Sequence, residues 1–257
     1  MFTNINNNQK VCIIIVTDNN YHTIENALNS ATLGLKKPDQ VIIGDNDSKD
    51  QTYEKVCQLL KAEKIKVEDK QGWPPKFETI FNDVPITIFR QRKSTKANAL
   101  NICIKMAKSD STIFGFLNAT DTYNMDKIFR SAQIFNMFPH VLCVVSDCDL
   151  SYKDGRCIRT FRSSPTIKNL INTYSYDSNF FVSKSAFAKM QRGFNETVSL
   201  MEDYELLLRI AKIGLIYHIA EPLHTHVIND NLIEEKTKIA NEIKQMIISE
   251  INNAQKA

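Results

Sequence analysis

The sequence predicts an α/β protein, a single domain with a central, mostly parallel sheet flanked by helices and followed by a C-terminal helix. Apolar runs rich in β-branched residues occur at residues 11–16 and 41–44, and such runs are typical of strands buried on both faces. A turn cluster and then a helical pattern follow each run. This alternation of strand, turn and helix is typical of parallel sheets.

The first half of the chain alternates strands and helices. Thr23 is placed to cap a helix whose apolar face includes Ile24 and Leu28. After the strand at 41–44, a helix is expected over about 51–64. The pattern then predicts a loop at 71–75, a strand at 86–89, a helix over about 95–107 and a strand at 113–117.

The pattern changes in the second half. It predicts a helix at about 126–137, a strand at 141–145, a hairpin over 150–158, a strand at 179–182, helices at 184–191 and 202–213, a strand at 215–219 closed by Glu221-Pro222, and a charged helix over 232–252. There is no internal repeat and no long linker, so one domain over residues 1–257 is expected. Within this domain, we expect residues from about 10 to 120 to bind one ligand and those from about 121 to 226 to bind another. The C-terminal helix is expected over about 231–256.

Composition limits the class of protein. A chain of 257 residues with 43% hydrophobic and 24% charged residues is long enough for a real core. The net charge of +3 is too small to argue for nucleic acid as a partner. The six cysteines show no CxxC and no regular spacing, which favours a reducing, cytoplasmic location. Residues 1–10 lack the apolar core of a signal peptide, and no apolar stretch approaches the ~20 residues of a membrane helix.

Short polar residues follow the first two strands. They are Thr17, Asp18, Asn19, Asp45 and Asp47. Because ligands of such sheets bind at the carboxyl ends of the strands, these residues are candidates for reading a nucleotide base such as uracil. The same residue types also cap helices, and either interpretation suits the pattern.

A basic cluster follows the strand at 86–89. It contains Arg90, Arg92, Lys93 and Lys96, which lie beside the expected crevice and are candidates for meeting a diphosphate. The alternative is a solvated run of charge, which is the usual meaning of such a cluster.

The strand at 113–117 ends in Asn118-Ala119-Thr120-Asp121, where an Asp-x-Asp pair would hold a divalent cation against a diphosphate. Hard cations prefer oxygen ligands and carboxylates first, and here only Asp121 is acidic. Such a site would depend on the phosphates of the nucleotide for many of the oxygen ligands that bind the cation. The same residues also suit a turn or a helix cap.

Two acids, Glu202 and Asp203, begin the helix expected at 202–213. A carboxylate there can act as a general base for a hydroxyl nucleophile, although acids in the first turn also complement the helix dipole. His224 and His226 alternate on an extended segment, so their side chains point the same way. They could form a metal pair, or they could be ordinary polar residues.

In this order and at these spacings, the segments resemble family 2 glycosyltransferases of the GT-A fold over about residues 10–226. The matching segments are 11–20 with 23–30, 44–52 (Gly-Asp-Asn-Asp-Ser-Lys-Asp-Gln-Thr), 96–104 (Lys-Ala-Asn-Ala-Leu-Asn-Ile-Cys-Ile), 192–196 (Arg-Gly-Phe-Asn-Glu) and 202–209. Segment 44–52 is similar to the Val-Asp-Asp-Gly-Ser-Thr-Asp-x-Thr turn of that family. Segment 96–104 is similar to its Lys-Ala-x-Ala-Leu-Asn-x-Gly-Ile helix.

The resemblance implies a Rossmann-like GT-A domain that transfers a sugar, with inversion, from a nucleotide-sugar donor, UDP-linked by preference, to a hydroxyl. It implies base contacts from Thr17 and Asp45, and it places Lys96 and Asn101 near the base and diphosphate. Asp203 would be the general base, with Glu202 as its neighbour. Asn118 and Thr120 would belong to the donor site. Mn or Mg would lie beside Asp121, with His224 or His226 as a further metal or phosphate contact. The acceptor stays open between a glycan, a lipid-linked group and a protein.

The departures from the family pattern define the competing functions. Asn118 and Thr120 replace both acids of the Asp-x-Asp motif, Asn46 replaces an acid of the nucleotide turn, and Cys103 and Arg192 replace glycines. The alternative to an enzyme is therefore a domain that keeps the shape and serves as a sugar reader or scaffold. A nucleotidyltransferase would need a glycine-rich loop after the first strand, and residues 17–23 contain no glycine.

Overall fold

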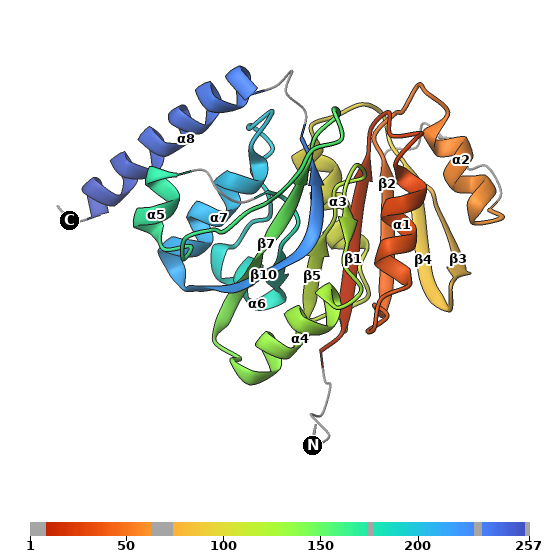
Figure 1. Ribbon diagram of the computed structural model, residues 1–257, viewed down its shortest axis with the longest axis horizontal. Helices are drawn as coiled ribbons and strands as arrows, with labels where there is room; N and C mark the ends of the chain where they lie inside the picture. Colours follow the sequence, from red (N-terminus) through yellow and green to blue (C-terminus); the bar gives the residue numbers. More distant parts are fainter. Residues whose placement is uncertain (1–8, 63–73, 174–176, 229–232, 255–257) are drawn as a thin grey trace.

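The structure is a computed structural model that describes residues 9–62, 74–173, 177–228 and 233–254. In this part of the chain the strands form one 10-stranded sheet in the order β3-β4-β2-β1-β5-β9-β7-β10-β6, with β8 paired to β7 (Figure 1). The strands that run in one direction are β1 (Val11–Thr17), β2 (Gln40–Asp45), β4 (Val84–Arg90), β5 (Ile113–Phe116), β7 (Val141–Ser151) and β10 (Leu215–Val227). The opposing strands are β3 (Lys76–Phe81), β6 (Thr122–Tyr123), β8 (Cys157–Arg159) and β9 (Phe181–Ser183). The predicted α/β class with a mostly parallel sheet is confirmed.

Helices cover both faces of the sheet (Figure 1). Helices α1 (Ile24–Thr32), α2 (Thr52–Leu59) and α4 (Lys127–Met137) pack on the face that includes Ile13 and Ile15. The other face, which includes Cys12 and Ile14, is covered by α3 (Lys96–Met106), α5 (Ile167–Asn172), α6 (Lys184–Met190), α7 (Glu202–Ile213) and α8 (Ile233–Ala254). Successive residues of a strand point to opposite faces, so β1 needs an unbroken apolar run, as the sequence predicted.

The strand β4 is preceded by a further strand, β3, in a segment where the sequence predicted no strand. The strand β3 alternates exposed and half-buried residues and pairs antiparallel with β4. Asn82 and Asp83 join the two strands with φ angles of 50° and 62°. Asn and Asp tolerate this left-handed conformation and suit a two-residue hairpin turn. The predicted loop at 71–75 lies largely outside the described residues.

Strand β10 is much longer than predicted. The sequence closed this strand at Pro222, but β10 continues to Val227 with register shifts on both sides of that proline. Proline is tolerated in a strand at a bulge, because the disrupted ladder does not need its missing N–H. The extension carries His224 and His226 along β7, and His224 also pairs with Tyr123 of β6.

The remaining helices mostly follow the prediction. The helix α7 has the predicted bounds, and α8 buries Ile243 and Ile247 against the core next to α7. Within the described residues, α2 ends at Leu59, before its predicted end. The helix α5 was not predicted, and it lies between the predicted hairpin at 150–158 and the predicted strand at 179–182.

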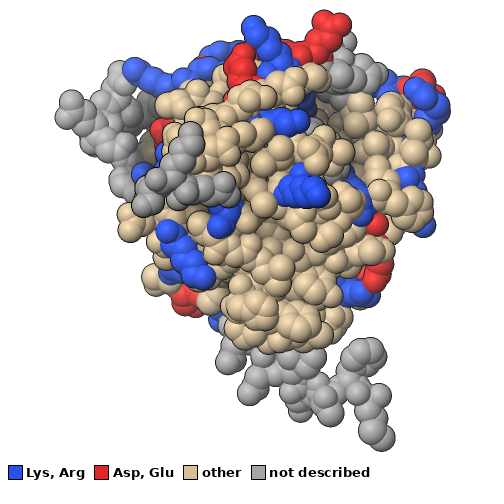
Figure 2. Space-filling view, turned by 90° about the vertical axis from the view of Figure 1, so that its left-hand side faces the viewer, with Lys and Arg blue, Asp and Glu red and all other residues tan. Residues whose placement is uncertain are grey.

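Among the described residues, the surface around α5 and α8 carries no single dense patch of positive charge. Figure 2 shows this side of the molecule, where Lys and Arg side chains are dispersed among uncharged residues. This agrees with the small net charge. Among the described helices, none is both long and apolar enough to cross a membrane.

Candidate active site

A small pocket opens at the carboxyl ends of β1 and β5, where the sequence predicted a ligand site. The first residue of α3, Lys96, and the first residue of α7, Glu202, both face it, together with Asn118 and Ser178. The rest of the lining is apolar and consists of Ile14, Val16, Leu100, Phe116, Leu117, Phe180 and Phe194. A few polar groups converging in an apolar pocket are typical of a small-molecule site.

The predicted general base lies beside this pocket. Asp203 is 7% exposed, and its Oδ2 accepts a hydrogen bond of 2.7 Å from the hydroxyl of Ser178. Burial, and then the charge of Glu202, raise the pKa of Asp203 above its ordinary value, although Lys96 and Ser178 oppose the shift. A raised pKa makes a carboxylate a better proton acceptor near neutral pH. Met201, which precedes the two acids, has a φ of 66°, a conformation that is uncommon for a residue other than glycine.

Lys96 connects the acids of α7 to the end of β5. Its ammonium lies 3.0 Å from Glu202 Oε1 and donates a 2.9 Å hydrogen bond to Asn118 Oδ1. Burial disfavours the charged amine, but the carboxylates of Glu202 and Asp203 outweigh burial and raise the pKa of Lys96. The pocket therefore holds a cation and a buried carboxylate within one group of contacts.

The carboxylate of Asp121 is fully enclosed. It is 1% exposed, and its Oδ2 accepts hydrogen bonds from Asn118 Nδ2 at 2.9 Å and Asn179 Nδ2 at 2.7 Å, with His226 Nδ1 at 2.8 Å. Its Oδ1 accepts from the backbone N–H of Val227 and the hydroxyl of Thr120, both at 2.9 Å. Burial opposes ionisation, but the hydrogen bond and charge of His226 hold the pKa of Asp121 below its ordinary value.

This arrangement tests whether the segment Asn118–Asp121 suits a divalent cation. Asn118 Oδ1 already faces the Lys96 ammonium, and both oxygens of Asp121 already accept hydrogen bonds. The hydroxyl of Thr120 is turned toward Asp121. Hard cations require oxygen ligands, with carboxylates preferred. Among the described residues of this segment, no carboxylate oxygen faces the pocket, so its donor set does not fit a divalent cation.

The two predicted histidines lie in different surroundings. His226 contacts Asp121. Burial alone would lower the pKa of His226, but the carboxylate of Asp121 outweighs burial and raises it. His224 is 1% exposed and instead pairs with Asp177, with its Nε2 at 2.9 Å from Oδ2. Asn179 links the two pairs, because its Nδ2 bonds both Asp121 and Asp177. The structure therefore brings His226 to Asp121 directly and His224 only through intermediates.

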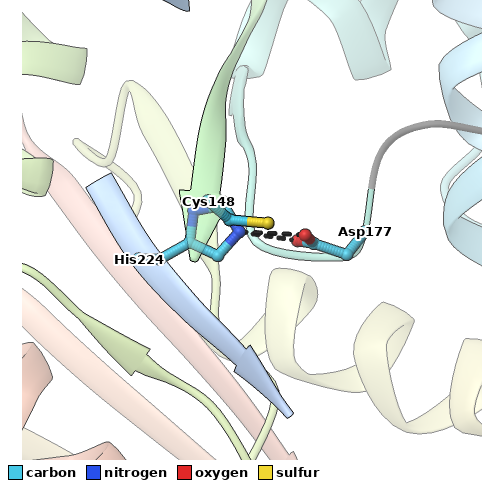
Figure 3. A group of neighbouring side chains, drawn as sticks. All are labelled: Cys148, Asp177 and His224. Carbon is cyan, nitrogen blue, oxygen red and sulfur yellow. Dashed lines mark hydrogen bonds and ion pairs between the residues drawn. The ribbon is translucent and has the colours of Figure 1, made fainter. Parts of the chain in front are cut away.

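Cys148 and Asp177 complete a group of potential metal ligands around His224. Within the described chain, one ligand atom of each lies within 4.8 Å of the others, and the side chains converge from β7, β10 and the segment before β9 (Figure 3). However, Nη2 of Arg162 lies 2.9 Å from both the Cys148 sulfur and Asp177 Oδ2. Burial raises the pKa of the Cys148 thiol to about 11, whereas a metal needs the thiolate. The group is an ion-pair network in which Arg162 already supplies the positive charge.

The ends of β1 and β2 form a separate polar edge. Thr17 and Asp45 are paired in register, and both are fully buried. One oxygen of Asp45 contacts Arg90 Nε at 3.2 Å and the N–H of Ser48 at 3.3 Å. The other, Oδ1, has no hydrogen-bond partner among the described residues. Burial raises the pKa of Asp45, although Ser48 and Arg90 oppose it. A buried acceptor without a partner is costly unless a ligand satisfies it.

The other predicted residues of this edge hold its turns together. Asp18 pairs with Lys93, and Asp47 pairs with Lys49 at 2.7 Å. Asn19 has a φ of 58° and bridges to the second turn by accepting a 2.7 Å hydrogen bond from the N–H of Lys49. These contacts explain the residue types locally. The predicted base contacts of Asp18, Asn19 and Asp47 stay predictions.

The predicted basic cluster is divided between two tasks. Arg90 supports the turn after β2, because its guanidinium contacts Asp45 and donates 2.9 Å to the carbonyl of Ser48. Lys93 ties that edge to Asp18. Lys96 alone in this cluster lines the pocket.

Asn101 differs from its predicted role. Its side-chain amide donates to the carbonyl of Phe194 at 2.9 Å and to Glu196 at 2.8 Å, and its oxygen accepts from the N–H of Phe194. A Cβ on Gly193 would lie 2.1 Å from this oxygen, so glycine is required there. Asn101 is thus occupied in holding the loop before α7, and a nucleotide contact from it has no support in this geometry.

Sequence analysis missed the polar segment that joins the site. Ser178 contacts Asp203, and Asn179 and Asp177 connect Asp121 with His224. The available signal was a run of three polar residues directly before a short apolar strand. It was overlooked because only the apolar part was interpreted.

Comparison with solved structures gives the fold. TarS of S. aureus, residues 1–349, has a TM-score of 0.69 and 17% identity, covering 95% of this chain and 66% of that chain. Mannosyltransferase PcManGT from Pyrobaculum calidifontis, in complex with GDP-Man and Mn²⁺, has a TM-score of 0.61 and 16% identity over 86% of this chain and 57% of that chain. GalNAc-T7 with UDP, GalNAc and Mn²⁺ has a TM-score of 0.61 and 15% identity over 86% and 44%. The chain thus spans less than two thirds of each of these solved chains, and the likeness shows the GT-A fold.

Comparison of sequences gives the family. Residues 12–191 match the model of glycosyl transferase family 2, so the chain belongs to that family. A search of curated protein sequences finds no match.

Proposed function

We propose that this protein is an inverting glycosyltransferase that moves a sugar from a nucleotide-diphosphate sugar to a hydroxyl acceptor. One observation carries the proposal. The Asp203 carboxylate lies directly beside the pocket that Lys96 and Glu202 line, and the hydroxyl of Ser178 contacts both Asp203 and the Lys96 ammonium. Sugar transfer needs both groups, because the nucleophile must lose a proton while negative charge leaves with the diphosphate.

The reaction would proceed in one displacement. The acceptor oxygen attacks the anomeric carbon, and the bond from that carbon to the diphosphate oxygen breaks. The electron pair leaves with the diphosphate, and Asp203 accepts the hydroxyl proton. Glu202 would hold Lys96 in place at 3.0 Å. Attack from the face opposite the leaving group inverts the anomeric centre, and no covalent enzyme intermediate is needed.

The donor side of the proposal rests on the edge formed by β1 and β2. The unpartnered Oδ1 of Asp45 suits the ring N–H of a uracil base, with Thr17 beside it. UDP is the preferred carrier because TarS has been solved with UDP and with UDP-GlcNAc, whereas PcManGT was solved with GDP-Man. In this assignment about residues 10–120 bind the donor and about 121–226 bind the acceptor within one domain.

Two further points belong to this proposal. PcManGT and GalNAc-T7 were solved with Mn²⁺, but we assign no divalent cation to Asp121, His224 or His226 here, because both oxygens of Asp121 already accept hydrogen bonds and the two histidines are paired with Asp177 and Asp121. A cytoplasmic site of action is inferred from the cysteines, of which Cys12, Cys103 and Cys143 are deeply buried thiols.

A second candidate function is a binding domain without turnover. The neutral side chains of Asn118 and Thr120 favour it, because they replace the two acids with which this motif usually binds the donor. Purified protein would be incubated with a panel of UDP- and GDP-sugars, with EDTA and with Mn²⁺, and free nucleotide would be measured. Release of nucleotide by wild type, lost in Asp203→Asn, is expected for the enzyme. Binding of nucleotide sugars without any release under either condition would establish the binding domain instead.

A further inference from the structure

The end of β5 presents a conflict between sequence and chemistry. The leaving diphosphate needs positive charge near it, yet the segment Asn118–Asp121 does not fit the divalent cation that would supply that charge. Within the described pocket lining, Lys96 carries the positive charge. It contacts the side chain of Asn118, the first position of the altered motif, at 2.9 Å.

We propose that the Lys96 ammonium replaces the divalent cation, so that this protein binds the donor diphosphate and transfers the sugar without a metal. The inference rests on the proposed function, since it concerns the same donor site.

The geometry of Lys96 leaves room for a phosphate oxygen. A protonated lysine has three N–H donors. Two of them are used at ordinary distances, toward Asn118 Oδ1 at 2.9 Å and Glu202 Oε1 at 3.0 Å. The third contact, to Ser178 Oγ, is at 3.5 Å, the outer limit of a hydrogen bond. The side chain of Lys96 is 36% exposed, so the pocket can deliver an anion to it.

The changes at the motif favour this use of Lys96. An acid at position 118 would pair with the ammonium and take up its charge. The amide of Asn118 instead accepts one hydrogen bond from Lys96 and donates one to Asp121, which positions both without neutralising the ammonium. Thr120 turns its hydroxyl to Asp121 and adds no charge. Glu202 holds the ammonium at 3.0 Å and leaves the third N–H of Lys96 for a phosphate oxygen.

Other cations near the site are engaged elsewhere. His226 is paired with Asp121, and Arg162 with Asp177 at 2.9 Å. Arg90 and Lys93 are bound to Asp45 and Asp18 at the other edge. We therefore assign the contact with the donor diphosphate to Lys96.

The test is calorimetric titration of UDP, GDP and uridine into wild type, in EDTA and then with Mn²⁺. Wild type is expected to bind a nucleoside diphosphate with Kd changing less than about twofold between the two conditions. The variant Lys96→Met should bind it about tenfold or more weakly, because a charge-assisted hydrogen bond is lost, while uridine binding is unchanged. The variant Lys96→Arg should restore most of the diphosphate affinity.

Lys105→Met, an exposed lysine near the end of the same helix, is the matched control and should behave as wild type. Thermal melts of each variant separate loss of folding from loss of binding, and the wild-type comparison of EDTA with Mn²⁺ needs no variant. If Mn²⁺ strengthens UDP or GDP binding tenfold or more, or if Lys96→Met binds as wild type, the inference is wrong while the proposed function stands. If neither nucleotide binds under either condition, the proposed function itself fails.

Discussion

Two buried carboxylates lie at the carboxyl ends of β2 and β5, the parallel strands on either side of β1, and they are partnered in opposite ways. Asp45 is the last residue of β2 and keeps Oδ1 without a partner among the described residues, and burial raises its pKa. Asp121 follows β5, both of its oxygens accept hydrogen bonds, and its pKa is lowered. The difference teaches that an acid at the ligand edge of such a sheet is not thereby a ligand group. The partners of each oxygen decide whether it binds or supports.

The comparison divides the site into an open edge and a closed one. The open edge has acceptors that a ligand can satisfy, and the closed edge is satisfied by the protein. Asp203 shares the raised pKa of Asp45, through burial and the charge of Glu202. Its oxygens nevertheless accept hydrogen bonds, from the hydroxyl of Ser178 and the N–H of Tyr204. At the closed edge Asp121 is a positioning residue. It holds Asn118 by a hydrogen bond, and Asn118 in turn orients Lys96.

The largest effect is expected from Asp203→Asn. Loss of the general base should lower the transfer rate by about 10²–10⁴-fold with nucleotide affinity little changed, because the amide cannot accept the proton. Initial rates of nucleotide release measure this, with Asp154→Asn on the exposed hairpin as the control. A variant that keeps the wild-type rate would remove Asp203 from the mechanism.

Asp121→Asn tests the closed edge. The amide would place an NH₂ group among the donors of Asn118, Asn179 and His226, and breaking such a buried arrangement costs about 3–5 kcal/mol of the free energy of unfolding. Urea unfolding followed by circular dichroism measures it, against the exposed Asp110→Asn. An unchanged midpoint would show that Asp121 is not a supporting residue.

Asp45→Asn tests the open edge, and it should weaken ligand binding while leaving the stability of the fold little changed. Its carboxylate is disfavoured by burial, so stability should change by less than about 1 kcal/mol. Uridine affinity should fall about tenfold, because an amide binds the base N–H less well than a charged oxygen. Titration of uridine checks this, with Asp39→Asn near the other end of β2 as the control. Equal uridine affinity in variant and wild type would place the base elsewhere.

The smallest effect is a pH dependence at the closed edge. The pKa of His226 is raised above 6.5 by Asp121, so the pair stabilises the fold below that pH and the contribution is lost as pH rises through the folded value. Asp121 must also be ionised, which sets the lower bound near its ordinary 3.8. The difference in unfolding free energy between wild type and His226→Gln should therefore shrink from about pH 5 to about pH 9. His140→Gln, on the surface, should give no such trend.

Local pattern was sufficient for much of this molecule. The buried runs of β1 and β2 predicted a parallel sheet because strands covered on both faces need apolar residues at every position. The amphipathic period of α7 gave its bounds, and the acids at its start indicated Glu202 and Asp203 as candidates. The short strand β3 escaped prediction because its alternating residues lie at a half-exposed edge.

Tertiary structure alone decided which of the candidate residues meet. Lys96 and Asn118 are 22 positions apart, and Ser178 and Asp203 are 25 apart, yet each pair is in contact because different strands and helices end at one pocket. The same packing turned Asn101 to the loop at Gly193 and took His224 to Asp177 instead of Asp121. Sequence spacing reports the element on which a side chain lies. Its hydrogen-bond partners come from other elements, and only the folded arrangement brings them within reach.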